Sequence, residues 1–428
     1  MTRFRWFVVF LLFAITVVNY VDRAAIAYAL PQMQKALDLS LAQSGAVLGA
    51  FGLGYAVTTL LGGFAVDRYG ARIVLTVAAM LWSLSIGLTG LASGLAMLYA
   101  ARVLLGVSEG PNFPALTGAV TPWLPPGERA TALGNALVAV PVALAAGGPL
   151  VTHLLAWLDW RATFGVLFVL SALWVPLWFF LFRDTPEQSR HVGRDELALI
   201  RTGDIRSGDG AASTAPAARH AWPGAAELGR LLANRTLLAN TWAFFVFGYF
   251  VFFFMSWLPS YLHHRYGLDL RTVGLFTVLP WLAAAVLLWA MSRWSDQLAT
   301  RTGNLRLART WMIAGSQLVA AIAVVPVALT GNLAVAIVGI TVAVAAAMGA
   351  NAAYYAVNVD IAPRRAATAL GIMDFAFALA GFAAPAITGW VLHLRGSFED
   401  AFLLMAALAL SSVVVVALFH HPDRDRVT

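Results

Sequence analysis

Twelve long apolar stretches, separated by short polar segments, run through the 428 residues of this chain. Each is about 20 residues long, the length that a helix needs to cross the hydrocarbon layer of a membrane. A water-soluble fold with 60% hydrophobic and only 11% charged residues would expose large apolar surfaces. The sequence therefore predicts an all-α integral membrane protein with twelve transmembrane helices. The stretches are residues 5–30, 44–65, 73–93, 96–119, 131–155, 161–182, 236–262, 270–294, 308–329, 332–357, 365–392 and 399–419.

Basic residues are unevenly shared between the two sides of this arrangement. An even number of spans puts both termini on one side, and most of the 28 lysines and arginines lie in segments on that side. The loops on the other side hold Lys35, Arg161, Arg265, Arg271 and Arg395. Because cytoplasmic loops of membrane proteins are rich in positive charge, we expect both termini in the cytoplasm. The net charge of +7 is then a feature of topology, and no nucleic-acid partner is expected.

One long polar connection divides the chain. Residues 183–235 are rich in Gly, Ala, Ser, Pro and Arg, so we interpret them as a cytoplasmic linker between bundles at 1–182 and 236–428. A weak repeat supports two pseudo-symmetric bundles of six helices, because "GGFAVDRYGAR" around Asp67 has an echo in "AMSRWSDQLATR" around Asp296. Paired bundles of this kind are typical of transporters that rock around a central site.

Charged side chains lie deep within two of the predicted spans. The stretch "VVNYVDRAAIAYA" contains Asp22 and Arg23, and "RVLLGVSEG" contains Arg102 and Glu109. A charge at the bilayer centre costs several kcal/mol, so such residues usually have partners and functions. At a rise of about 1.5 Å per residue, Asp22 and Arg102 reach similar depths from opposite sides. We expect one internal cluster in which Asp22 pairs with Arg102, and Arg23 is free to bind a carboxylate from solution.

The charge balance of this cluster suggests a chemistry. Two carboxylates and two guanidiniums cancel, so each proton bound would leave the site positive and attract an anion. This favours proton-coupled symport of a small organic anion, powered by the proton gradient without any cofactor. The alternative is that these residues form ion pairs that hold helices together.

Several motifs resemble those of one known family. "GGFAVDRYGAR" resembles the signature loop of the major facilitator superfamily. "NYVDRAAIAYALPQMQ", "RVLLGVSEGPNFPA", "WLPPGERATA", "RDTPEQSRHVGRDEL" and "SWLPSYL" together resemble its anion:cation symporter family, which includes sugar-acid and aromatic-acid importers of the galactonate and hexuronate type. The resemblance covers almost the whole chain. It implies the major facilitator fold, a monomer and a place in the bacterial inner membrane.

The resemblance also implies roles for individual residues. Asp22 and Glu109 match the protonatable carboxylates of galactonate-type members, and Arg23 and Arg102 match their arginines. The predicted substrate-side tyrosines are Tyr20 and Tyr55. The predicted gating loop contains Asp67, Arg68 and Arg72, although charges there also serve topology.

The chain departs from the sugar-acid pattern at three places. Val138 and Ala139 replace an expected glutamine, phenylalanines fill "FVFGYFVFFFMSW", and Asp374 and Ala378 stand where two asparagines are expected. Polyol hydroxyls would find few partners here. The departures therefore favour a less hydroxylated carboxylate, either aromatic or short and aliphatic.

Asp374 is the residue that the pattern explains least. It could be a further proton site, a partner for an ammonium group on a zwitterionic substrate, or an acceptor bonded to Tyr354, Tyr355 or Asn351 on a neighbouring helix. All three remain open at this stage, and the three neighbours are included among the candidate substrate-binding residues.

Other classes of function are less well supported. Proton-coupled export of a drug or metabolite is the alternative, although exporters of cations do not need buried arginines. No metal is expected, because no two histidines have metal-ligand spacing, and no phosphate-binding loop or hydrolase triad is found, so we do not expect an enzyme. The Gly110-Pro111 pair is predicted to break the fourth span beside Glu109.

Overall fold

The structure is a computed structural model that describes residues 4–206, 225–362 and 366–425. No strand occurs among these residues, and the described chain is built of helices. The helices are α1 (Phe4–Leu37), α2 (Leu41–Gly90), α3 (Leu95–Glu109), α4 (Asn112–Trp123), α5 (Pro126–Trp157), α6 (Trp160–Leu181), η1 (Pro186–Gln188), α7 (Arg194–Arg206), α8 (Ala225–Ala233), α9 (Arg235–Tyr266), α10 (Leu270–Phe276), α11 (Val278–Thr302), η3 (Arg306–Thr310), α12 (Trp311–Leu329), α13 (Leu333–Gly349), α14 (Asn351–Ile361), α15 (Ala366–Arg395) and α16 (Glu399–Phe419).

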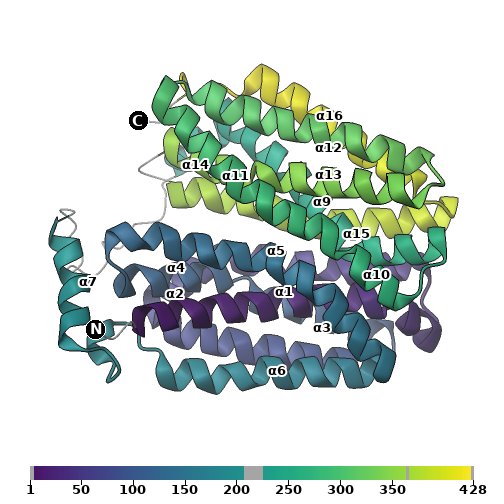
Figure 1. Ribbon diagram of the computed structural model, residues 1–428, viewed down its shortest axis with the longest axis horizontal. Helices are drawn as coiled ribbons and strands as arrows, with labels where there is room; N and C mark the ends of the chain where they lie inside the picture. Colours follow the sequence, from purple (N-terminus) through teal and green to yellow (C-terminus); the bar gives the residue numbers. More distant parts are fainter. Residues whose placement is uncertain (1–3, 207–224, 363–365, 426–428) are drawn as a thin grey trace.

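The long helices lie roughly side by side in two groups (Figure 1). Helices α1 to α6 form the N-terminal bundle, and α9 to α16 form the C-terminal bundle. Both chain ends and α7 lie at the left end of Figure 1, here called the termini face, and the opposite end is called the far face. The boundaries at residues 182 and 236 stay a prediction.

Eleven stretches are long and apolar enough to cross a membrane among the residues described. The twelfth expected span is present as two shorter helices, α3 of 15 residues and α4 of 12 residues. The break falls at Gly110 and Pro111, as the sequence predicts, because proline lacks the N–H that would continue the helix. Two further expected helices are also interrupted, at Thr277 between α10 and α11 and at Ala350 between α13 and α14.

The second and third expected spans are both present as the two parts of α2, which meet at a kink inside the predicted connection. Gly70 is the residue of α2 with non-helical dihedral angles, and its φ of 81° suits glycine. A side chain at this position would also meet the Asp184 carboxylate at 2.6 Å. Asp184 accepts a hydrogen bond from the Arg72 backbone N–H at 2.9 Å, which fixes the bend against the end of α6.

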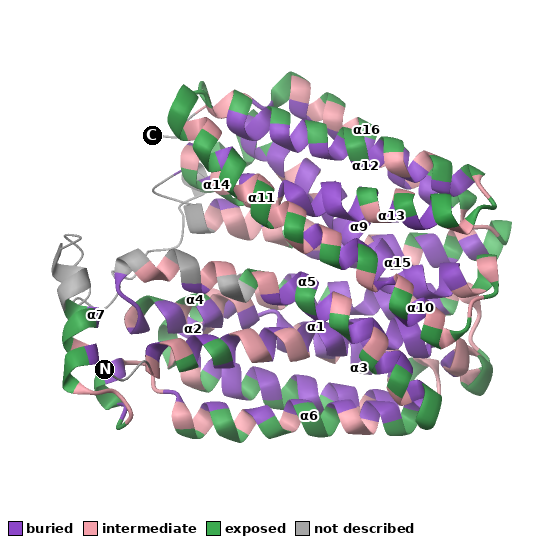
Figure 2. Ribbon diagram, viewed as in Figure 1, coloured by how far each residue is buried: buried purple, intermediate pink, exposed green. Residues whose placement is uncertain are grey.

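The outer surface of the bundles is apolar. Large hydrophobic side chains are exposed on the outward faces of α6 and α16, among them Leu173, Phe180, Val414 and Leu418. Figure 2 shows these exposed positions alternating with buried ones along both helices. Apolar surface of this extent is unfavourable in water and favourable in lipid, so the fold is that of a multi-pass membrane protein.

The linker holds a helix on the N-terminal bundle. The Arg5 side chain donates to Glu128 of α5 at 2.8 Å and to Glu196 of α7 at 3.1 Å. The backbone N–H groups of Phe4 and Arg5 also donate to Glu196, at 3.2 and 3.1 Å. Composition alone indicated a polar linker here and did not predict α7.

The segment after α16 returns onto the C-terminal bundle. Thr236 of α9 donates to Asp425 at 2.9 Å, and the backbone N–H of Leu305 donates to Asp423 at 2.9 Å. His420 is fully buried between these contacts, with its Nδ1 at 2.7 Å from the Thr310 hydroxyl. Burial lowers the pKa of His420 to about 3.

This histidine makes stability depend on pH. Its ring stays neutral in the folded state, whereas an unfolded chain would protonate it below about pH 6.5. The folded state should therefore lose stability as pH falls from 6.5, by about 2 kcal/mol at pH 5. We expect H420N to show a smaller loss of apparent melting temperature between pH 7 and pH 5 than the unchanged chain. The exposed His393→Asn is the control, and an equal loss in both variants would contradict the assignment.

Candidate functional site

Helix α1 carries four polar side chains on consecutive turns at mid-length. Asn19, Tyr20, Asp22 and Arg23 are each 6% exposed or less. The neighbouring α2 and α3 touch backbone to backbone, because a side chain at Gly106 would meet the Phe51 carbonyl at 2.0 Å. This close approach of glycine-containing helices brings the rings of α2 beside the charges of α3.

Arg23 and Glu109 form a fully buried ion pair. The Arg23 Nη2 and Nε donate to one oxygen of Glu109 at 2.8 and 3.0 Å, and Nη2 also reaches Asn19 at 3.3 Å. The guanidinium lies over the rings of Tyr20 and Phe51, each at 4.4 Å, and of Tyr55 at 5.1 Å. The expectation that Arg23 is free for a substrate is therefore wrong in this conformation, because Glu109 already occupies it.

Asp22 lies away from both arginines. Its Oδ2 accepts a short hydrogen bond from Ser171 of α6, and it makes no ion pair with a described basic residue. The expected Asp22–Arg102 pair is therefore not formed in this structure. Residues 22 and 23 are neighbours on one helix, so their side chains point about 100° apart. Consequently Asp22 faces α6 while Arg23 faces α3.

Arg102 is the guanidinium left without a counterion. It is 3% exposed, its Nε is buried without a hydrogen-bond partner, and it has no ion pair with a described carboxylate. Its guanidinium carbon lies 5.4 Å from the centre of the Phe51 ring, and that of Arg23 lies 4.4 Å from the same ring. Glu109 keeps one oxygen, Oε1, without a partner. A buried guanidinium without a counterion can bind an anion, and a buried carboxylate oxygen without a hydrogen-bond partner can bind a proton.

Asp374 faces this cluster from the C-terminal bundle. Its Oδ1 accepts a hydrogen bond from the Tyr355 hydroxyl at 3.3 Å, which is one of the contacts expected from the sequence. Helix α15 touches α2 beside this pair, because a side chain at Gly52 would meet the Ala378 carbonyl oxygen, one helical turn after Asp374, at 2.7 Å. The structure thus places Asp374 and Tyr355 at the boundary next to the part of α2 that carries Tyr55.

Two of the other candidates lie elsewhere. Tyr354 is fully buried inside the C-terminal bundle, where its hydroxyl accepts from Gln317 at 2.9 Å. Asn351 is the first residue of α14 and is half-buried. Their assignment to the substrate stays a prediction.

The predicted gating residues lie at the termini face. Asp67 and Arg68 are exposed, whereas Arg72 donates to the Phe179 carbonyl at 2.8 Å and lies over its ring at 4.3 Å. In the related motif of the other bundle, Asp296 pairs with Arg309 at 3.0 Å. Arg72 therefore fixes α2 to α6 within one bundle here, and a latch between bundles stays a prediction.

The bundles touch closely toward the far face. A side chain at Gly389 of α15 would meet the Gly45 backbone of α2 at 2.6 Å, and one at Gly148 of α5 would meet the Thr277 hydroxyl at 2.4 Å. The Tyr28 hydroxyl donates to Thr277 across the same boundary at 3.1 Å. These contacts close the far face in the described conformation.

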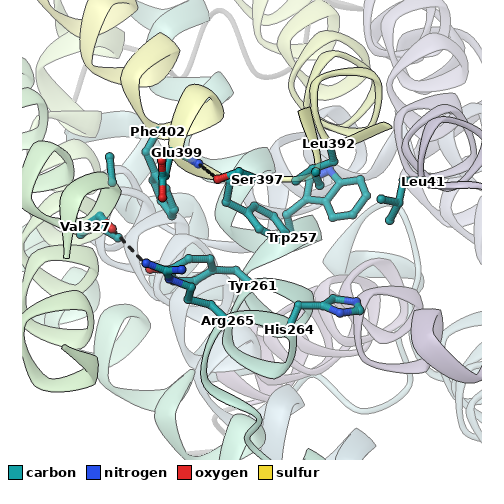
Figure 3. Close-up of a pocket in the computed structure, with 13 residues that line it drawn as sticks. Leu41, Trp257, Tyr261, His264, Arg265, Val327, Leu392, Ser397, Glu399 and Phe402 are labelled. Carbon is teal, nitrogen blue, oxygen red and sulfur yellow. Dashed lines mark hydrogen bonds between the residues drawn. The ribbon is translucent and has the colours of Figure 1, made fainter. Parts of the chain in front are cut away.

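A pocket of about 520 Å³ lies on the far face, separate from the charged cluster (Figure 3). Tyr261 forms part of its wall, with its ring 4.9 Å from that of Phe402, and Arg265 and Glu399 also line it. Leu41 of α2 closes the side next to the N-terminal bundle. None of the residues predicted from the sequence to form the site lines this pocket.

Sequence reasoning missed three members of the cluster. Asn19 precedes Arg23 by one helical turn, a spacing that could have identified it. Phe51 gave no signal, because aromatic residues in membrane helices are common. Ser171 lies 149 residues from Asp22, and only the fold shows that the two meet.

Two bundles around a buried charged cluster, closed at one end, define a membrane transporter rather than an enzyme. Residues 12–385 match the Major Facilitator Superfamily. The chain belongs to this superfamily.

Sequence relatives transport organic acids, as their names state. The chain is 31% identical over 418 residues to the hexuronate transporter of Bacillus subtilis, with 97% of this chain and 94% of that one covered. It is 33% identical over 407 residues to a probable sulfoacetate transporter of Cupriavidus necator, with 95% and 91% covered.

Solved structures share the fold. A bacterial homologue of the human lysosomal transporter Spinster, in an inward-facing and occupied conformation, matches with a TM-score of 0.76 and 18% identity, covering 100% of this chain and 99% of that chain. A D-xylose–proton symporter matches with a TM-score of 0.73 and 14% identity over the full length of both chains.

Proposed function

We propose that this protein is a proton-coupled symporter that imports a small organic carboxylate by alternating access. It acts as a monomer in a bacterial inner membrane, with the termini face in the cytoplasm. The observation that carries the proposal is Arg102, a buried guanidinium without a described counterion beside the Arg23–Glu109 pair. The printed names of the acid-transporting relatives support an anionic substrate.

The charges of the cluster suggest how a proton and an anion are coupled. A buried carboxyl group whose described partner is a neutral hydroxyl, as for Asp22 and Ser171, is better accommodated when protonated. The remaining groups, Arg23, Arg102 and Glu109, then sum to one positive charge, which an anion neutralises. Loss of the proton from Asp22 removes that excess, so the anion is released.

Glu109 provides the second half of this exchange. An anion bound at Arg102 competes for the Arg23 guanidinium, because both guanidiniums lie near the Phe51 ring, at 4.4 and 5.4 Å from its centre. Glu109 would then lose part of its ion pair and accept a proton at its unpartnered Oε1. Proton and anion therefore favour each other's binding, which is the requirement for symport.

The test is transport in proteoliposomes with a pH gradient. We expect labelled sulfoacetate or benzoate to accumulate when the outside is acidic, and hexuronate, which carries several hydroxyl groups, to accumulate less. Accumulation driven by the opposite gradient would favour the alternative, proton-coupled export. If none of these acids is transported in either gradient while organic cations are, the proposal is wrong.

The Asp22→Asn variant isolates the coupling step. Because asparagine cannot exchange a proton, we expect uptake driven by the pH gradient to fall at least tenfold. Counterflow exchange needs substrate binding but no net proton movement, so it should persist and show that the variant is folded. Asp400→Asn, a change at an exposed far-face residue, is the matched control. Unchanged gradient-driven uptake in the Asp22 variant would remove Asp22 from the coupling scheme.

A further inference from the structure

The C-terminal bundle presents an acidic group to the central site. Asp374 of α15 is half-buried, and its described hydrogen-bond partner is the Tyr355 hydroxyl at 3.3 Å. Tyr355 is 36% exposed, so this pair lies at an accessible surface of its bundle. Asp374 lies one helical turn before Ala378, whose carbonyl oxygen a side chain at Gly52 of α2 would meet at 2.7 Å, so this surface faces the N-terminal bundle.

Asp374 has no ion pair with a described basic residue. Arg23 of the charged cluster is already held by Glu109 and Asn19. A carboxylate in this position costs free energy unless a cation or several hydrogen-bond donors reach it. The phenol of Tyr355 is a single neutral donor, so the described residues leave this carboxylate incompletely satisfied.

A chain of aromatic rings connects the acidic group to the two arginines. The rings of Tyr355 and Phe244 are 5.6 Å apart, and the chain continues through Phe377 at 5.3 Å, Phe252 at 5.0 Å and Phe51 at 6.3 Å. Phe51 in turn lies beside both Arg23 and Arg102. Ring faces attract cations and pack against flat apolar groups, but they offer few partners to a polyhydroxylated chain.

We propose that the substrate is a dipolar carboxylate with its charges at opposite ends. The carboxylate of the substrate binds Arg102, and its ammonium group binds Asp374 with Tyr355. The part between them, an apolar ring or a short methylene chain, lies along the chain of aromatic rings that runs from Tyr355 to Phe51. The carboxylate end of this substrate rests on the proposed function, and the ammonium end is the new element. The charged ends are separated because Arg102 and Asp374 belong to different bundles, which the substrate bridges as they close around it.

Three para-substituted benzoates test this assignment. 4-(Aminomethyl)benzoate, 4-(hydroxymethyl)benzoate and 4-methylbenzoate share a carboxylate and a ring and differ in a single group. We expect the detergent-purified full chain to bind the ammonium compound with a dissociation constant about tenfold lower than the other two. Thermal-shift titration measures this, since a ligand that binds the folded state raises the melting temperature.

The Asp374→Asn variant locates the preference. It should lose the tenfold preference for the ammonium compound over 4-methylbenzoate, whereas the control Asp400→Asn should keep this preference. The dipolar-substrate proposal is wrong if the unchanged chain binds the ammonium compound no more tightly than the other two acids, or if Asp374→Asn keeps the preference. Either result would leave the anion symport proposal standing. If none of the three acids binds while benzylamine does, the anion symport proposal fails as well.

Discussion

Replacing Arg102 with glutamine should strongly weaken the binding of organic acids without destabilising the protein. Arg102 has no ion pair with a described carboxylate, so its removal leaves no described partner unpaired and takes away a desolvated positive charge. The anion, in contrast, would lose its main cationic partner. A charge-assisted contact of this kind contributes about 1.5–3 kcal/mol, so the dissociation constant should rise by about ten- to a hundredfold.

A comparison with Arg23 makes this prediction specific. Glutamine at position 23 would leave Glu109 buried at 0% side-chain exposure without its cation. Breaking one side of a buried ion pair typically costs about 3–5 kcal/mol. We therefore expect Arg23→Gln to lower the melting temperature markedly and Arg102→Gln to leave it unchanged or raise it.

Binding and stability are both measured by thermal-shift titration of the purified variants. The control is Arg161→Gln at the far face, where the arginine donates to the Ala92 carbonyl at 3.0 Å and lies outside the cluster. If the Arg102→Gln variant binds organic acids with the same affinity as the unsubstituted protein, Arg102 does not hold the substrate.

Sequence patterns predicted the membrane fold because hydrophobic length is a one-dimensional signal. About 20 apolar residues form a helix in lipid wherever they lie in the chain. A Gly-Pro pair is a weaker signal, because Gly110-Pro111 separates α3 from α4 whereas Gly148-Pro149 lies inside the unbroken α5. The connection between the second and third spans was also predicted, because polar residues such as Asp67 and Arg68 usually mark loops, and the helix breaks there at Gly70. The hydrogen bond that fixes this break joins Asp184 to the Arg72 backbone, 112 residues apart in the chain, and spacing could not predict it.

Of the four charged residues expected to form one cluster, Arg23, Glu109 and Arg102 lie around Phe51, whereas Asp22 bonds Ser171 and the expected Asp22–Arg102 pair is not formed. Depth along a helix follows from residue number, and this placed Asp22, Arg23, Arg102 and Glu109 near one level. The direction of each side chain depends on how the helix is rotated within its bundle. That rotation is set by close glycine contacts, such as Gly106 against the Phe51 carbonyl, and by partners such as Ser171 on a distant helix. Spacing within one helix carries no information about either.

A bulky side chain at Gly389 should prevent the far face from closing and so stop transport. The Cβ of any such residue would lie 2.6 Å from the Gly45 Cα and 2.7 Å from the Leu41 carbonyl oxygen. These are backbone atoms, which cannot move away as a flexible side chain can. The contact disappears when the bundles separate at this end, so Gly389→Leu penalises one conformation and spares the other. A penalty of about 1–3 kcal/mol from overpacking would shift the ratio of the two conformations by about five- to a hundredfold.

The absence of cysteine from the chain allows this shift to be measured directly. Thr152 is 2% exposed on α5, where it packs against Gly274 of α10 at the closed far face. In a Thr152→Cys background, Gly389→Leu should increase the rate of labelling by a membrane-impermeant maleimide by at least fivefold while uptake is lost. Gly315→Leu on α12 is the matched control, because a side chain there meets no heavy atom within 4 Å. If Gly389→Leu shows slow labelling and normal uptake, the closed far face is not a state of the transport cycle. Alternating access around the Arg102 cluster would then need a different closing contact.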